Sequence, residues 1–96
     1  MNIEITSRHF IASEELKALI NEKISKVNKY NIELTRCHVI LSQENTFEKS
    51  VEIVAHSKGH EFIAHDNSNV FEKSLTASIN KLLIQLKKQH DKIKDH

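Results

Sequence analysis

Alternation of apolar and polar residues predicts four short strands along this chain. Ile3 and Ile5 alternate with polar neighbours over residues 2–6, which is the two-residue period of a half-buried strand. Lys58-Gly59 is a strong turn signal, so the segments on either side of it are expected to form a hairpin. The same alternation recurs over residues 34–43, 47–57 and 61–66.

Apolar residues at helical spacing predict two helices. Ser13 is a good N-cap, with Glu14 and Glu15 in the first turn where the helix dipole favours anions, and this helix is expected to reach about Tyr30. The second is expected to begin near Asn69, which has capping-box spacing to Glu72, and to continue to the C-terminus. The apolar stripes consist of Leu16, Leu19, Ile20, Ile24 and Val27 in the first helix, and of Phe71, Leu75, Ile79, Leu82, Leu86 and Ile93 in the second.

The order of these elements predicts one α+β domain over residues 1–96. We expect a two-layer β-α-β-β-β-α sandwich, in which a four-stranded mixed sheet carries both helices on one face. The second helix spans about 36 Å at about 1.5 Å per residue, whereas a chain of this size has a radius of gyration of about 12 to 13 Å. Its last turns are therefore expected to overhang the sheet.

Composition removes several classes of protein. The N-terminus lacks the pattern of a signal peptide and no apolar run approaches the length of a membrane span, so a cytoplasmic protein is expected. Cys37 is the only cysteine, which excludes an internal disulfide framework. The absence of proline and the single glycine, Gly59, exclude glycine-rich phosphate loops.

The formal charge of +1 conceals an uneven distribution of charge along the chain. Residues 31–80 hold four basic and seven acidic groups, whereas residues 81–96 hold five basic and two acidic groups. At about 100° per residue, Lys81, Gln85, Lys88 and Lys92 form one row on the face of the second helix turned away from the core.

A second lysine series, Lys23, Lys26 and Lys29, lies on the first helix. Lys23 falls between the directions of Leu16 and Leu19, so its side chain must extend past apolar neighbours to reach water. Lysine rows of this kind are commonly solvated helix faces. Two basic ridges on adjacent helices also suit phosphate backbones, and with Arg8 and Arg36 as the only arginines, backbone recognition of folded RNA is favoured over base readout.

The sequence gives little support for a catalytic site or a metal-binding site. His56, His60 and His65 flank the predicted hairpin, but no further ligand has the spacing of a metal site. Cys37 lies on the apolar side of a strand and is interpreted as a core residue. The carboxylate pairs Glu14/Glu15 and Glu48/Glu52 do not form an acid/base dyad, so we expect a binding protein without enzymatic activity, metal, other cofactor or small-molecule substrate.

Several segments resemble the ribosome hibernation promoting factor family, also called ribosome-associated inhibitor A or sigma-54 modulation proteins. They are residues 5–10 (ITSRHF), 22–30 (EKISKVNKY), 38–42 (HVILS), 80–82 (NKL), 85–88 (QLKK) and 92–96 (KIKDH). The resemblance runs from the first strand to the last residue, and its most specific parts are the two lysine-bearing helices. It implies the β-α-β-β-β-α order and a likeness to double-stranded-RNA-binding domains.

The resemblance further implies that the protein docks between the head and body of the small ribosomal subunit. There it would overlap the mRNA and tRNA sites and silence translation in resting or stressed cells, alone or with a second hibernation factor. The chain resembles the short form of the family, without the additional dimerisation domain or acidic tail. The candidate RNA-contacting residues are Arg8, Lys23, Lys26, Lys29, Lys81, Gln85, Lys87, Lys88 and Lys92.

The chain departs from the family pattern at three places in the second helix. Ile84 stands where the family commonly has arginine, Gln89-His90 replaces a His-Lys pair, and residues 70–72 differ from the usual helix start. Two alternatives stay open beside the resemblance. One is a general double-stranded-RNA module, and the other is a protein-interaction domain that uses Leu83 and Ile84 on the second helix.

Overall fold

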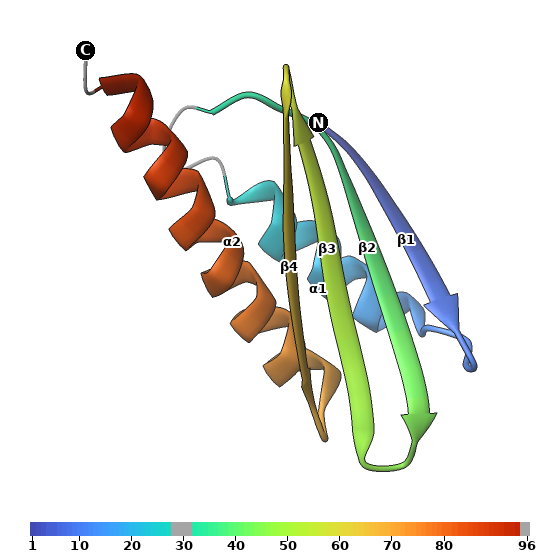
Figure 1. Cartoon of the computed structure of the whole chain (residues 1–96). Helices are drawn as coiled ribbons and strands as arrows, with labels where there is room; N and C mark the ends of the chain where they lie inside the picture. The colour runs from blue at the N-terminus through green and yellow to red at the C-terminus, as the bar shows by residue number, and fades with distance from the viewer. Residues whose placement is uncertain (28–31, 95–96) are drawn as a thin grey trace.

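The computed structural model describes residues 1–27 and 32–92, together with the backbone of the last helix to Lys94. Figure 1 shows the elements in the predicted order, a strand, a helix, three strands and a long helix. Their bounds are β1 Asn2–Arg8, α1 Glu14–Ser25, β2 Leu34–Asn45, β3 Glu48–Ser57, β4 His60–Ser68 and α2 Phe71–Lys94.

The four strands form one mixed sheet in the order β1-β2-β3-β4. β1 and β2 are parallel, and the other two pairs are antiparallel, with Gly59 at φ 80° in the β3–β4 turn. This confirms the predicted α+β class and mixed sheet. β1, β2 and β4 extend beyond their predicted ends because ladder pairing continues through polar positions such as Arg8 opposite Ser42.

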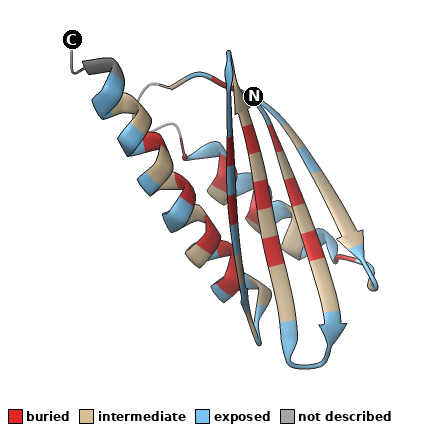
Figure 2. Cartoon of the chain, viewed as in Figure 1, coloured by how far each residue is buried: buried red, intermediate tan, exposed pale blue. Residues whose placement is uncertain are grey.

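Both helices pack on the same face of the sheet, as predicted. The buried strand residues alternate, so that Ile5, Val39, Ile53 and Ala64 lie in register across the sheet and point toward one layer. Figure 2 shows this layer as bands of buried residues on the strands and on the inner sides of the helices. Its helical residues include Ile20, Ile24, Leu75, Leu82 and Leu86.

Cys37 lies in this layer and is fully buried. Burial raises the pKa of its thiol to about 11, partly offset by the charge of the N-terminal amine. The thiol is therefore protonated at neutral pH, which agrees with the interpretation of Cys37 as a small core residue.

α1 begins as predicted and ends earlier than predicted. The Leu16 N–H donates to Ser13 Oγ at 3.1 Å, which makes Ser13 the N-cap. The helix ends at Ser25, because the backbone N–H groups of Lys26 and Val27 donate to carbonyls only three residues earlier. Val27 is buried although it lies beyond the helix end, and the predicted end at Tyr30 falls outside the described residues.

α2 begins at Phe71, slightly later than the predicted start near Asn69. The Ser74 N–H donates to the Val70 carbonyl at 3.1 Å, so the helix begins one residue after Val70. The Val70 N–H donates to the Ser68 hydroxyl rather than to a side chain of the predicted cap, Asn69. α2 then runs obliquely across β4 (Figure 1). Among its described side chains Leu86 is the last fully buried one, and Gln89 still contacts β4 through His60 at 3.0 Å.

Candidate nucleic-acid interface

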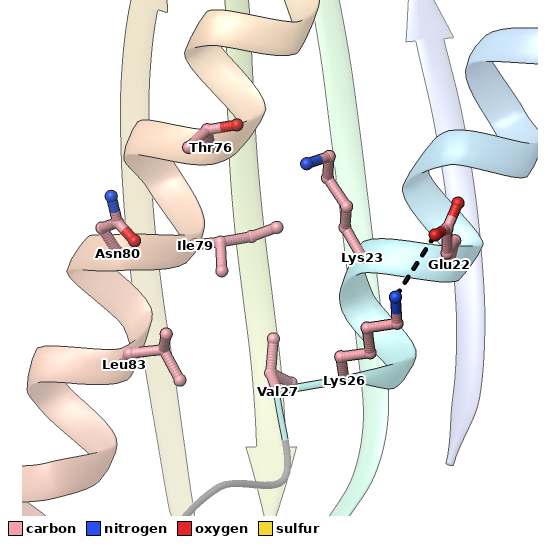
Figure 3. A pocket seen from close by; sticks show the side chains of 8 residues that line it. All are labelled: Glu22, Lys23, Lys26, Val27, Thr76, Ile79, Asn80 and Leu83. Atoms are coloured by element: carbon pink, nitrogen blue, oxygen red, sulfur yellow. Dashed lines mark hydrogen bonds and ion pairs between the residues drawn. The ribbon is translucent and has the colours of Figure 1, made fainter.

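A groove of about 270 Å³ lies between α1 and α2 on the helix side of the molecule (Figure 3). Apolar side chains of Val27, Ile79 and Leu83 form part of its wall, and polar groups surround them. The full lining consists of Glu22, Lys23, Lys26 and Val27 from the α1 side and Thr76, Ile79, Asn80 and Leu83 from α2.

Lys23 is the central cation of this groove. Its side chain is half-buried and extends into the space between the helices, as the helical wheel predicted (Figure 3). Within the described parts of the chain, the ammonium group of Lys23 forms no hydrogen bond or ion pair. An ammonium group held there without a carboxylate is available to an external anion.

Lys26 also lines the groove, but a carboxylate of its own helix holds it. Its Nζ lies 3.3 Å from Glu22 Oε1, and both side chains are well exposed. Exposed pairs of this kind contribute little to stability and exchange readily with other partners. The sequence analysis did not predict that Glu22 pairs with Lys26, although a spacing of four residues on a helix favours such an ion pair.

On α2, the predicted row of Lys81, Gln85, Lys88 and Lys92 follows the edge strand β4. Lys81 Nζ donates to the His65 carbonyl at 3.0 Å, and Gln85 Nε2 donates to the Ile63 carbonyl at 2.6 Å. The row is turned away from the core as predicted, but the prediction did not include the contacts of Lys81 and Gln85 with β4. These two side chains satisfy outward-pointing carbonyls of an edge strand.

Asp66 completes the arrangement around Lys81. Its carboxylate lies 3.1 Å from Lys81 Nζ, and this hydrogen bond, followed by one from the Asn67 backbone N–H, lowers the pKa of Asp66. No sequence signal connects these residues, because they are fifteen positions apart and lie on different elements.

The remaining α2 lysines divide between two sides of the helix. Lys88 and Lys92 are exposed and continue the row that begins at Lys81. Lys87 is also exposed, and its spacing of four residues from Leu83 places it on the groove side of α2. The structure thus brings Lys23, Lys26 and Lys87 to one side of α2, and Lys88 and Lys92 to the other.

Two predicted residues are not brought into this group. Arg8 lies on the opposite face of the sheet, because the alternation that turns Ile3 and Ile5 toward the helices turns Arg8 away from them. Lys29 lies outside the described residues.

The histidines of the β3–β4 hairpin interact with nearby side chains. His56 Nδ1 lies 3.4 Å from Glu61 Oε2, and its Nε2 lies 3.4 Å from Arg36 Nη2. In the described ranges, no three His, Cys, Asp or Glu side chains are grouped so that they could hold a metal ion. Among the described helices, none is both long and apolar enough to cross a membrane.

Comparison with known proteins identifies the family. The family model described as "Sigma 54 modulation protein / S30EA ribosomal protein" matches residues 3–94. The chain belongs to this family. Among curated members, it is 27% identical over 96 residues to the ribosome hibernation promoting factor of Escherichia coli K12, and the match covers the full length of both chains.

Solved structures carry the same fold. A ribosomal subunit interface protein from Coxiella burnetii superposes with a TM-score of 0.86 at 25% identity, over 93% of this chain and 97% of the other. The N-terminal domain of Thermus thermophilus Protein Y superposes with a TM-score of 0.81 over 92% and 98% of the two chains, and at 19% identity it shows the fold alone. The family and these relatives together support a ribosome-associated role in hibernation.

Proposed function

We propose that this protein is a hibernation factor that binds the small ribosomal subunit in the mRNA/tRNA channel and inhibits translation in resting or stressed cells. Its action is binding, with rRNA as the direct partner and with no reaction catalysed. This chain belongs to the matched family, and the observation that carries the proposal is the groove between α1 and α2, where the Lys23 ammonium has no partner among the described residues.

The chemistry of the helix side favours phosphate over base recognition. A lysine ammonium interacts with a phosphate oxygen as a point charge. Recognition of a base edge in a nucleic-acid groove commonly uses arginine in a bidentate hydrogen-bonded contact. Neither arginine lies on α1 or α2. Contacts of this type fix the position of a protein on folded RNA, and the shape of the RNA supplies the selectivity.

The lysines differ in how readily each can meet a phosphate. Four lysines can meet a phosphate without first breaking an ion pair to another described residue: Lys23, Lys87, Lys88 and Lys92. Lys26 must first leave its ion pair with Glu22, and Lys81 must leave both Asp66 and the His65 carbonyl. We therefore assign the largest contributions to the first group and the smallest to Lys81. Gln85, which already donates to Ile63, would act mainly by holding α2 against β4.

Co-sedimentation with purified small subunits at low and at moderate salt tests the proposal. We expect binding that weakens as salt rises, because contacts with phosphates release condensed cations. Lys23→Glu and the double variant Lys88→Glu/Lys92→Glu should each reduce binding about tenfold or more. The control is Lys73→Glu, the same charge change at an exposed position in the first turn of α2 that does not line the groove, which should stay within about twofold of the unmodified protein.

Three outcomes would contradict the proposal. Failure to co-sediment at low salt would remove the ribosome as partner, and binding independent of salt would remove the phosphate mechanism. Equal competition by any free duplex RNA would instead indicate a general double-stranded-RNA module. Ile84 is 57% exposed, so a dimer that dissociates on Ile84→Ser in sedimentation equilibrium would favour the protein-interaction alternative.

A further inference from the structure

The face of the sheet opposite the helices is uncovered in the described structure (Figure 1). Its residues lie in rows across the strands, set by the ladder register. One row runs Thr6, Ile40, Glu52 and His65, and the adjacent row places Arg8, Ser42 and Ser50 side by side. Ile63, also on this face, is 51% exposed, which shows that no part of the described chain covers it.

A hollow of about 240 Å³ lies where these two rows meet. Ile40 gives it an apolar element, the Ser42 and Ser50 hydroxyls face each other across the β2–β3 ladder, and the Glu44 and Glu52 carboxylates line it. Arg8 and His65 complete the lining from the two outer strands.

The two carboxylates are poorly partnered. Glu52 is half-buried on the central strand β3, and no hydrogen bond or ion pair joins its carboxylate to another residue of the described ranges. In the described ranges Glu44 forms one ion pair, with His9 at 4.0 Å, and both of those side chains are largely exposed. Arg8 and His65 line the same hollow without pairing with Glu52 in the described structure, so its carboxylate is available to an external cation.

The charge on this face is opposite in sign to that of the helix side. Its strand residues include Glu4, Glu44, Glu52 and Glu61 against Arg8 and Arg36, whereas lysines dominate the groove and the C-terminal half of α2. Phosphates are disfavoured beside an excess of carboxylates, and the rings on this face are the imidazoles of His38, His56 and His65, of which His38 already bonds to Thr6 and His56 to Arg36 and Glu61. The charge on this face therefore favours a cationic partner over nucleic acid.

We infer that the open sheet face is a docking surface for a basic polypeptide segment, with one arginine or lysine side chain seated in the hollow between Glu44 and Glu52. The aliphatic stem of that side chain would lie on Ile40, and its charged end would reach the carboxylates and the Ser42 and Ser50 hydroxyls. Exposed Ile63 and half-buried Val54, which pair across β3 and β4, supply adjoining apolar contact. This surface is separate from the helix side, so the inference does not depend on RNA binding.

Fluorescence anisotropy with a labelled nine-residue peptide of alternating arginine and serine tests this inference. The peptide should bind the full chain at low salt, and a matched peptide of alternating glutamate and serine should not. Glu52→Gln should weaken binding about five- to tenfold, and Glu44→Gln/Glu52→Gln should weaken it further. Glutamine preserves the size of the side chain, and an unchanged thermal midpoint would confirm that each variant is folded.

The matched controls remove the same charge elsewhere. Glu61→Gln acts on the same face outside the hollow, and Glu14→Gln acts on the first turn of α1. Each should change affinity less than about twofold. Equal weakening by Glu61→Gln and Glu52→Gln would overturn the assignment to the hollow, and absence of peptide binding at low salt would overturn the docking surface itself. Amide shifts of β2 and β3 on addition of a duplex RNA, without peptide, would indicate that the face binds RNA instead.

Discussion

The two helices cover the same face of the sheet but are attached to it by different interactions. α2 combines a buried apolar stripe with side-chain hydrogen bonds to the strands, from Ser74 to the Lys49 carbonyl at 2.7 Å and from Ser78 to the Val51 carbonyl at 3.1 Å. Lys81 and Gln85 add bonds to β4. α1 packs through apolar residues such as Ile20 and Ile24, and no side-chain hydrogen bond joins its described residues to the sheet.

This difference in attachment gives the two helices different properties as parts of a binding surface: one is held in a fixed position and the other can adjust. Directional bonds fix both the rotation and the position of α2, so its lysines are held in place relative to the sheet. Apolar contacts hold α1 with less directional constraint, which lets Lys23 and Lys26 adjust to a partner across the groove. We therefore expect α2 to act as the rigid wall of the groove and α1 as the adjustable one.

The largest effect is expected where α2 enters the core. Leu82 is fully buried, so Leu82→Ala should lower the free energy of unfolding by about 2 to 5 kcal/mol, measured by urea denaturation. The neighbouring position Ile84 is 57% exposed, and Ile84→Ala should change stability by less than about 0.5 kcal/mol. Similar losses for both variants would show that α2 is not oriented as described.

A smaller effect tests the directional bonds of α2. Ser78 is fully buried, and its hydroxyl lies 2.8 Å from the Ser74 carbonyl and 3.1 Å from the Val51 carbonyl, so Ser78→Ala should cost about 1 to 2 kcal/mol even though alanine has the higher helix propensity. Thr76→Ala, at an exposed position of the same helix, should be neutral or slightly stabilising. If Ser78→Ala is also neutral, the bond to β3 does not help to hold α2.

The cap of α1 tests the other side of the comparison. Ser13→Ala removes the acceptor of the Leu16 N–H and should cost about 1 kcal/mol. In native-state hydrogen exchange, the amides of α1 should lose protection while those of α2 change little, because α1 opens with fewer attachments. A uniform loss across both helices would contradict the proposed difference in attachment.

The smallest effect concerns Asp66 and depends on pH. The folded-state pKa of Asp66 lies below its ordinary value of 3.8, so its pairing with Lys81 stabilises the fold above that value and the stabilisation is lost as pH falls through the lowered pKa. Asp66→Asn should reduce the urea midpoint slightly at pH 7, and the difference between the two proteins should shrink as pH falls through the lowered pKa, because protonated Asp66 no longer carries the charge that pairs with Lys81. Glu33→Gln, an exposed change outside this pair, should show no such pH dependence.

The element order and the core could be predicted from the sequence because the apolar residues at strand or helix spacing are the ones that the fold buries. Ile20, Ile24, Leu75, Leu82 and Leu86 are buried as the helical spacing required. Helix ends were predicted less well, since they depend on local hydrogen bonds. Val27 continued the apolar stripe of α1, but the chain had already left the helix, and the start of α2 was set by Ser68 and Val70 rather than Asn69.

The candidate site was predictable only in part. A helical wheel places Lys23 correctly because its direction is measured from the stripe of its own helix. It could not show that Lys81 and Gln85 reach β4, since that contact depends on how α2 crosses the sheet. The position of Arg8 was within reach of the sequence, because it alternates with Ile3 and Ile5 and so must lie on the other face.

The side chains that cover β4 also determine how this molecule meets other copies of itself. An edge strand with free carbonyl and amide groups is a template on which a strand from another chain can add, and repeated addition leads to fibrils. Lys81 and Gln85 occupy two of the carbonyls that such a strand would need. Aggregation through β4 therefore requires α2 to detach first, so the barrier against it is as high as the cost of exposing the core beneath that helix.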